Sequence, residues 1–277
     1  MRIICLVDNT AARGSTLWAE HGLAMLIETD DGAVLWDTGQ SGDVLWHNLT
    51  QLRLDDRPLS AVALSHAHQD HTGGLASVLA RYPRVPIYGH SALFTERFSS
   101  RNDRLRAIGL QDGEGLRQRH SFFLSSEPQQ IINDVWTTGT ITPRPYPEGS
   151  SPNHKMRFAG QVLADRYDDD MSLVLATPGG LVLVCGCCHA GLRNTLGVLR
   201  RRVQGPLRAI LGGAHLTGVD AAEIDALIEA LRQEGSPRLY LNHCTGEKAL
   251  FRLQQAFGEG VHPFPAGAAL TFNGGAG

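Results

Sequence analysis

The chain has 277 residues, of which 42% are hydrophobic and 19% charged, and its formal net charge is -3. This apolar content excludes a disordered or collagen-like chain, and the near-neutral charge argues against a dedicated nucleic-acid binder. No apolar stretch approaches the ~18 residues that suggest a membrane span, so we expect neither a nucleic-acid nor a membrane partner.

The cysteines and the first residues predict where the protein works. Three of the five cysteines crowd together at Cys185, Cys187 and Cys188, whereas a disulfide framework spaces and pairs them. The first residues lack the long apolar region and cleavage site of a signal peptide. We therefore expect a reduced, cytoplasmic protein; whether it forms a homo-oligomer is left open.

The first 65 residues are typical of strands. Asp30-Asp31-Gly32 is a hairpin turn signal between two of them. The last strand runs into a histidine-rich loop, and a helical pattern then begins at Leu75 and ends before Pro83. The expected strands cover residues 2–8, 23–29, 33–36 and 61–65.

Residues 84–170 have poor periodicity, with a brief strand, a Pro-rich segment and an arginine-rich stretch around 92–107. Arg97, Arg101 and Arg104 are spaced as on one face of a helix, so a helix is expected there. We interpret 84–170 as an insertion or cap in a single domain spanning 1–277, and expect it to roof the functional site.

Strands and helices alternate in the second half, after a hairpin over 172–186. Alternation after a strand-rich first half indicates an α+β fold with mixed sheets and covering helices, such as a sandwich of two sheets with helices outside. The expected helices cover 192–202, 221–234 and 247–257, and the expected strands 207–211, 238–242 and 268–272.

The strongest chemical signal is His66-x-His68-x-Asp70-His71, four potential ligands within six residues between a strand and a helix. His66 and His68 are two residues apart, so in extended backbone they project to the same side. Asp70 and His71 follow where the chain turns and can aim elsewhere. One loop can therefore serve two adjacent metal ions, and imidazole with carboxylate suits zinc, iron or manganese.

Three further histidines each follow a predicted strand: His189, His215 and His243. The carboxyl ends of strands that share a direction meet at one edge, where open α/β sheets place their sites. We expect His189 and His243 to be ligands, and His215 to support a ligand or contact substrate. Glu20 and His21 precede a strand and are expected either to hydrogen-bond the metal loop or to serve as capping or surface residues. Most cysteines are expected to be buried and unreactive, and the remaining histidines to be ordinary surface or core residues: His47, His90, His120, His154 and His262.

These motifs together resemble the metallo-β-lactamase superfamily, and Asp37-Thr38-Gly39 resembles its first motif, whose aspartate supports the metal loop. The resemblance implies an αββα sandwich with two divalent ions, zinc being the expected metal, at one edge. It implies His66, His68 and His189 at one ion and Asp70, His71 and His243 at the other.

Further segments resemble one branch of this superfamily, whose named member is the 7,8-dihydropterin-6-methyl-4-(β-D-ribofuranosyl)aminobenzene-5'-phosphate synthase of methanopterin biosynthesis. They include Asp8-Asn9-Thr10, Glu20-His21-Gly22-Leu23, residues 186–191, residues 212–216 and His243-Cys244-Thr245-Gly246.

One position departs from the superfamily pattern. The usual bridging aspartate follows a glycine at the end of a strand, but here Cys187 follows Gly186. A thiolate there is either a ligand or inert. We favour a Cys187 that is not a ligand, which leaves the number of ions open.

The function expected from this site is a metal-dependent hydrolase of a small molecule, with a phosphate ester or cyclic ester favoured. Hydroxide formed from metal-bound water would attack, and Asp70 would orient it. The alternatives are a pterin or phosphoribosyl synthase-like enzyme of the same branch, a di-iron redox protein, and a non-catalytic ligand-binding protein. Di-iron members typically have a glutamate where His68 stands, and complete metal motifs argue against the last alternative. Asp37-Thr38-Gly39 also matches the aspartic-protease loop, but those enzymes need two such carboxylates.

Overall fold

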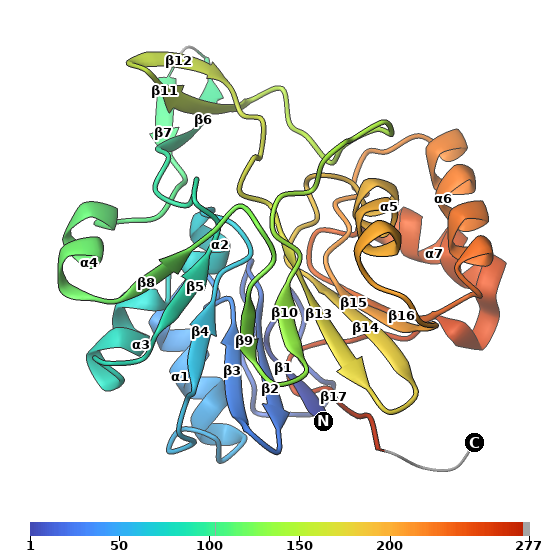
Figure 1. The fold of residues 1–277 in the computed structure, drawn as a ribbon, viewed down its shortest axis with the longest axis horizontal. Coiled ribbons are helices and arrows are strands. Elements are labelled where there is room, and N and C mark those ends of the chain that lie inside the picture. Colours follow the sequence, from blue (N-terminus) through green and yellow to red (C-terminus); the bar gives the residue numbers. More distant parts are fainter. Residues whose placement is uncertain (103, 274–277) are drawn as a thin grey trace.

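Two large mixed β-sheets lie face to face in the computed structural model, which describes residues 1–102 and 104–273 (Figure 1). Within that part of the chain the first sheet has seven strands, antiparallel at one end and parallel at the other. In spatial order they are β17 (Ala269–Thr271), β1 (Arg2–Val7), β2 (Ala24–Thr29), β3 (Gly32–Trp36), β4 (Ala61–Ala63), β5 (Ile87–Gly89) and β8 (Phe122–Leu124).

The second sheet has six strands within the described ranges, and its parallel strands are the three at one edge. In spatial order they are β16 (Arg238–Leu241), β15 (Leu207–Gly212), β14 (Gly180–Cys185), β13 (Ser172–Thr177), β10 (Val135–Thr137) and β9 (Gln130–Ile132).

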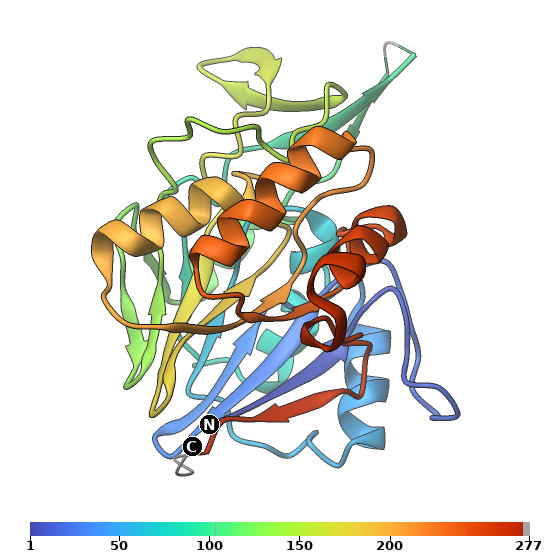
Figure 2. The ribbon, with the colours of Figure 1, turned by 90° about the vertical axis from the view of Figure 1, so that its right-hand side faces the viewer.

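Helices cover both outer faces of the sandwich. The first sheet packs against α1 (Gly42–Gln51) and α3 (Leu75–Arg81), and the second against α5 (Leu192–Arg202), α6 (Ala221–Gln233) and α7 (Glu247–Phe257), which face the viewer in Figure 2. The short helices are α2 (Gln69–Thr72), α4 (Gly113–Arg119) and the 3-10 turn Gly258–Gly260. None of the helices described is long and apolar enough to cross a bilayer.

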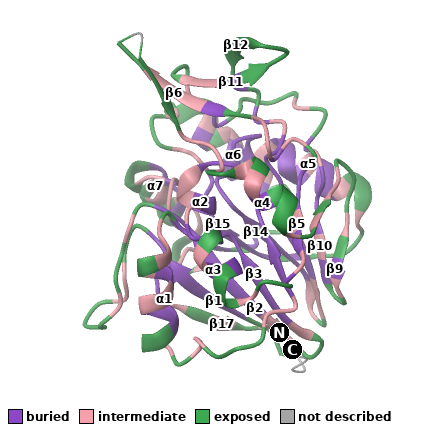
Figure 3. Cartoon of the chain, turned by 90° about the vertical axis from the view of Figure 1, so that its left-hand side faces the viewer, coloured by how far each residue is buried: buried purple, intermediate pink, exposed green. Residues whose placement is uncertain are grey.

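Alternating side chains build the layers. In β1, Ile3 and Cys5 point into the core between the sheets, whereas Ile4 and Leu6 pack on the helix side. Each large apolar side chain buried in this way contributes about 1.5–3 kcal/mol to stability. The central strands are accordingly almost wholly buried (Figure 3). The predicted αββα sandwich and its α+β class are confirmed.

A small third sheet, the roof sheet, stands at one end of the sandwich (Figures 1 and 3). It consists of β12 (Gln161–Ala164), β11 (His154–Phe158), β6 (Arg97–Arg101) and β7 (Arg104–Ala107). Much of the rest of 84–170 joins the main sheets, since β5 and β8 extend the first and β9 and β10 the second. The organisation as one domain with a cap stays a prediction.

The arginine-rich stretch is where the expected secondary structure is wrong. A helix around 92–107 was predicted, but β6 and β7 form an antiparallel hairpin there. The reason is tertiary, because Arg97 is buried: its Nη2 lies 2.6 Å from Asp169 Oδ1 and its Nε 3.3 Å from Asp165 Oδ2. Asp169 also accepts a hydrogen bond from the backbone N–H of Ala67, inside the histidine loop.

The second half agrees closely with expectation. Helices α5, α6 and α7 form where the 3.6-residue periodicity predicted them, and strands β15 and β16 lie between them. Helix α1 was not expected. Its N-terminus is capped by Ser41, whose side chain accepts a hydrogen bond from the Val44 N–H.

Candidate metal centre

The predicted site residues meet at one edge of the sandwich, where several strands end. Asp37 follows β3, His66 follows β4, and His189 and His243 follow β14 and β16, which run parallel to β15 between them. Segments more than 170 residues apart in the chain therefore come into contact, as in the pair His71 and His243. The structure shows this convergence, and the ligand roles of these residues stay predictions.

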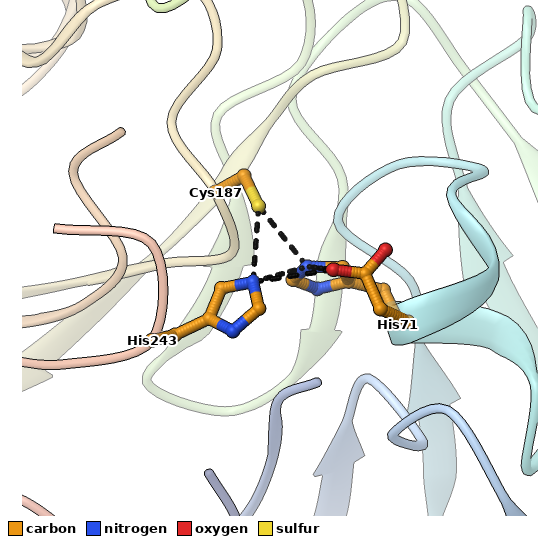
Figure 4. Close-up of side chains that lie close together, drawn as sticks. His71, Cys187 and His243 are labelled. Carbon is orange, nitrogen blue, oxygen red and sulfur yellow. Dashed lines mark hydrogen bonds and ion pairs between the residues drawn. The ribbon is translucent and has the colours of Figure 1, made fainter. Parts of the chain in front are cut away.

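Asp70, His71 and His243 form one compact cluster, here called the Asp70 group (Figure 4). The Nε2 atoms of His71 and His243 lie 3.2 Å apart. Asp70 Oδ2 lies 3.5 Å from the first and 3.3 Å from the second. Three potential ligand atoms thus face a common point.

Hydrogen bonds fix the orientation of both rings in the Asp70 group. His71 Nδ1 donates to Asp37 Oδ2 at 2.7 Å, and His243 Nδ1 donates to Asn9 Oδ1 at 3.0 Å. With the ring proton on Nδ1, each Nε2 presents a lone pair to the common point, the arrangement that carboxylate or amide acceptors impose on metal-ligating histidines.

His66, His68 and His189 form a second cluster, here called the His66 group. His66 Nε2 lies 3.0 Å from His68 Nδ1, and the ring of His189 is centred 5.0 Å from each of the other two. His66 Nδ1 donates to Ser65 Oγ, and His189 Nδ1 donates to the carbonyl of Gly149 at 2.7 Å. With the proton on Nδ1, the Nε2 atoms of His66 and His189 each keep a lone pair that can bind a cation.

These donors suit divalent cations. His189 Nε2 is buried and has no hydrogen-bond partner among the residues that the structure describes. A buried polar atom without a partner is costly, so an electron-pair acceptor belongs beside it. Imidazole nitrogens with one carboxylate are the ligands that zinc, iron and manganese take in proteins, so the residues fit the group of ions that the sequence predicted.

The charges of the two groups differ. Burial lowers the pKa of His66 and His189, and the neighbouring imidazoles lower it further, so both rings remain neutral. Burial alone would raise the pKa of Asp70, but the adjacent His71 and His243 outweigh it and hold that pKa well below its ordinary value. Burial opposes protonation of His71 as well, yet Asp70 and Asp37 raise its pKa, which shows that this part of the site attracts positive charge.

Asp37 and His215, expected to support the site, both contact it. Asp37 is fully buried, and besides His71 it accepts hydrogen bonds from the backbone N–H and the hydroxyl of Ser65. The ring of His215 is centred 4.3 Å from that of His189. Both residues, like His243, adopt a left-handed backbone conformation, which costs about 1–3 kcal/mol and persists because the surrounding structure holds it.

Cys187 lies between the two groups rather than apart from them. Its Sγ is 3.1 Å from His71 Nε2 and 3.3 Å from His243 Nε2 (Figure 4). It also belongs, with His66 and His189, to a set of ligand atoms that all lie within 4.8 Å of one another. Burial and the neighbouring Cys244 raise the pKa of the Cys187 thiol.

A cavity of about 170 Å³ opens onto both groups. Besides predicted site residues it is lined by side chains for which the sequence predicted no such role: Arg106 and Ile108 at the roof sheet, His154 in β11, and Gln40, Gln69 and Cys244. His154 was expected to be an ordinary surface or core histidine, and no motif around it signals its place. His21 also lines the cavity, and its Nε2 lies 3.4 Å from Asp70 Oδ2. It belongs to Glu20-His21-Gly22-Leu23, one of the segments that resemble the synthase branch.

A larger cavity of about 490 Å³ lies elsewhere, between α5 and strands of the second sheet. Its walls are mostly apolar, with Trp136, Val174 and Leu199 among them, and it contains none of the predicted ligands. Size alone would favour this cavity, but the chemistry of the side chains favours the smaller one.

Comparison with known proteins agrees with this fold. Residues 17–153 match the model of the metallo-beta-lactamase superfamily. The crystal structure of Tm1679, a metal-dependent hydrolase of the beta-lactamase superfamily, is 26% identical and superposes with a TM-score of 0.85 over 98% of each chain. A diphosphatase of the PhnP family, 12% identical with a TM-score of 0.53 over 98% of each chain, shares the fold alone. Residues 17–153 thus belong to the metallo-β-lactamase superfamily by sequence, and the chain as a whole has the fold of that superfamily.

The similarity extends to one particular relative. The 7,8-dihydropterin-6-methyl-4-(beta-D-ribofuranosyl)-aminobenzene-5'-phosphate synthase of Methanocaldococcus jannaschii is 27% identical in an alignment of 298 positions, which covers 98% of this chain and 97% of the relative. The resemblance to this branch, drawn from the motifs, is therefore confirmed. It establishes kinship and leaves the substrate of this chain to be argued from its own residues.

Proposed function

We propose that this protein is a metal-dependent hydrolase of a small phosphate ester or cyclic ester, with two divalent cations, zinc in the first place, held by the Asp70 and His66 groups. One observation carries the proposal. Four buried or partly buried imidazoles, those of His66, His71, His189 and His243, each donate Nδ1–H to a protein acceptor and direct Nε2 inward. Such a set is built to bind electron-pair acceptors.

The proposed hydrolysis needs both the bound cations and the side chains around them. When bound, divalent cations lower the pKa of a coordinated water and polarise an ester oxygen. Asp70, which stays ionised beside His71 and His243, is placed to help hold a cation at Oδ2 and to orient the attacking oxygen by accepting a hydrogen bond from it. The deep burial of His66 and His189 excludes bulk water from the inner wall of the site.

The cavity walls support an anionic substrate. Arg106 and His154 reach the cavity from the roof sheet, and the ring of His154 is centred 5.1 Å from that of His68. A guanidinium offers a planar fork of donors that matches phosphate, and an arginine at this place would hold the non-reacting end of a phosphorylated molecule. The cavity of about 170 Å³ has room for a small molecule or for the reacting end of a larger one.

A second candidate is synthase-like chemistry on a pterin or phosphoribosyl substrate. The observation that favours it is the near full-length similarity to a synthase whose product carries a ribofuranosyl phosphate. Both candidate functions use the same predicted ligands and the same cavity wall formed by Arg106 and His154. They differ in whether water or a second organic substrate attacks.

Metal analysis combined with a substrate panel tests the proposal. The purified protein is expected to retain divalent metal and to hydrolyse at least one of a set of phosphomonoesters, phosphodiesters and lactones. The double variant H66A/H68A is expected to lose metal and activity with little change in circular dichroism.

His120→Ala is the matched control, because the side chain of this half-buried histidine hydrogen-bonds the carbonyl of Pro83 and belongs to neither group of predicted ligands. Full metal content in H66A/H68A would overturn the ligand assignment. Metal without turnover on the panel, but with condensation of a pterin and a phosphoribosyl compound, would favour the second candidate. Iron with oxygen consumption would instead indicate redox chemistry.

A further inference from the structure

We propose that Cys187 is a shared ligand, whose thiolate bridges the cation of the Asp70 group and the cation of the His66 group. The proposal rests on the proposed function, since it requires that both groups hold ions. It reverses the preference drawn from the sequence, which was for a Cys187 that is not a ligand. Geometry is the reason for the reversal.

Cys187 is the one side chain common to all three clusters of His, Cys, Asp and Glu that are able to hold an ion in the described part of the chain. The first cluster is the Asp70 group with Cys187, and the second joins Cys187 to His66 and His189. An atom within reach of both sets of ligands occupies the place of a bridge.

The end of β14 is built to bring this thiol inward. A Cβ at Gly186 would lie 2.1 Å from Ser65 Oγ and 3.2 Å from Asp37 Oδ2, so only glycine lets the strand press against the loop that holds His66. Residue 187 then follows directly over the rings of His71 and His243 (Figure 4). The close approach at Gly186 thus sets the position of the sulfur.

The neighbouring cysteines do not share this place. Cys185 and Cys188 belong to the apolar layer between the second sheet and its helices, and Cys188 Sγ contacts Thr195 Oγ1. Cys244 is nearer, because its Sγ lies 3.5 Å from the carbonyl oxygen of Cys187, and it forms the third cluster with Cys187 and His215. It is absent from the two clusters that contain the other predicted ligands, and so it is the natural comparison.

Charge favours a thiolate bridge. The His66 group consists of neutral imidazoles and brings no negative charge of its own to a divalent cation. A thiol that binds such a cation releases its proton to solvent and supplies one negative charge to both positions. Sulfur is also a good ligand for zinc, alongside imidazole.

Cobalt(II) substitution tests the bridge without any assay of activity. Metal-free protein titrated with Co(II) is expected to develop thiolate-to-cobalt charge-transfer absorption in the near ultraviolet, and to release one proton more than Cys187→Ser does. That variant is expected to lose the absorption and to bind its weaker equivalent of metal at least about tenfold less tightly.

Three further variants make the result decisive. Cys187→Asp is expected to bind two equivalents without charge-transfer absorption, since a carboxylate can also bridge. Cys188→Ser and Cys244→Ser are expected to keep the absorption. If Cys187→Ser is poorly folded, Cys187→Asp alone decides, because retained absorption there overturns the proposal.

The outcomes separate this inference from the proposed function. Wild-type protein that binds no Co(II) would refute the metal centre itself. Wild-type protein that binds two equivalents without charge-transfer absorption, or loses that absorption in Cys244→Ser but not in Cys187→Ser, would refute the bridge and leave the metal centre intact.

Discussion

The Asp70 group and the His66 group lie side by side but are supported differently. Behind the Asp70 group stand a buried carboxylate, Asp37, and the amide of Asn9. Behind the His66 group stand a hydroxyl and a carbonyl, those of Ser65 and Gly149. One group therefore concentrates negative charge, whereas the other offers neutral imidazoles.

Because of this difference, we expect the two positions to bind a cation with unequal affinity. A divalent cation is held more tightly where carboxylates offset its charge, so we expect the Asp70 group to load first and to resist a chelator longer.

Asp70→Asn is expected to have the largest effect. It removes the one carboxylate that points at the common centre of the Asp70 group, and with it the acceptor proposed for the attacking water. Activity, measured as kcat/KM on the best substrate of the panel, is expected to fall about 100- to 10,000-fold. His120→Ala serves again as the control, and an Asp70→Asn variant with normal activity would contradict the role of this carboxylate.

Asp37→Asn is expected to weaken both positions together. Asp37 accepts from His71 directly, and it accepts from the Ser65 hydroxyl that in turn accepts from His66. Metal affinity, followed by competition with a chromophoric chelator, is expected to drop about 10- to 100-fold at both positions. A loss of affinity for only one equivalent of metal would show that the hydrogen bonds from Asp37 through Ser65 to His66 do not contribute to metal binding.

Asn9→Ala sharpens the comparison, because Asn9 supports the Asp70 group alone, through His243. The same titration is expected to show about a tenfold loss at the tighter position and no change at the weaker one. Equal losses at both positions would mean that the two groups do not load independently.

Replacement of Asp170 is expected to have the smallest effect, which is confined to the pH dependence of the free energy of unfolding. Its Oδ2 accepts from the Ala190 N–H beside His189, its Oδ1 has no partner among the described residues, and burial raises its pKa to about 7. Between about pH 4 and pH 7 the unfolded chain gives up this proton while the folded chain keeps it. The free energy of unfolding is therefore expected to decrease, as pH rises through this window, by roughly 1 kcal/mol per pH unit.

Asp170→Asn removes this dependence. Urea unfolding of wild-type and variant protein at several pH values, with a chelator present, checks it. Asp168→Asn is the control, because Asp168 is an exposed residue paired with Arg166. Parallel pH profiles for wild type and Asp170→Asn would show that Asp170 is ionised in the folded state.

The sandwich was predictable because local pattern and tertiary burial agree in it. Strands such as β14 alternate between two buried faces, and α6 carries a helical apolar stripe that begins after its Asp220 cap. In the roof sheet they disagree. Arg97 is spaced like a residue on a solvated helical face. It is nevertheless buried, because it pairs with Asp165 and Asp169, which lie about 70 residues further along the chain. No local pattern reveals such a partner.

The candidate site divides in the same way. Ligand-type residues at strand ends were visible, since their spacing and position are local properties of the sequence. The placement of His154 and Arg106 was not, because it depends on how the roof sheet stands over the cavity. The sequence left open whether Cys187 is a ligand, because that depends on the distance of its sulfur from histidines that other segments supply.

The buried pairing of Arg97 with Asp165 and Asp169 has a consequence for protein engineering. Separating a buried ion from its partners costs about 3–5 kcal/mol, so a chimera that exchanges only one end of this segment would leave uncompensated charge next to the histidine loop. Residues 97–169 therefore form a cassette that has to be grafted whole. Because this segment also contributes β8, β9 and β10 to the two large sheets, such a graft has to replace those strands together with the roof sheet.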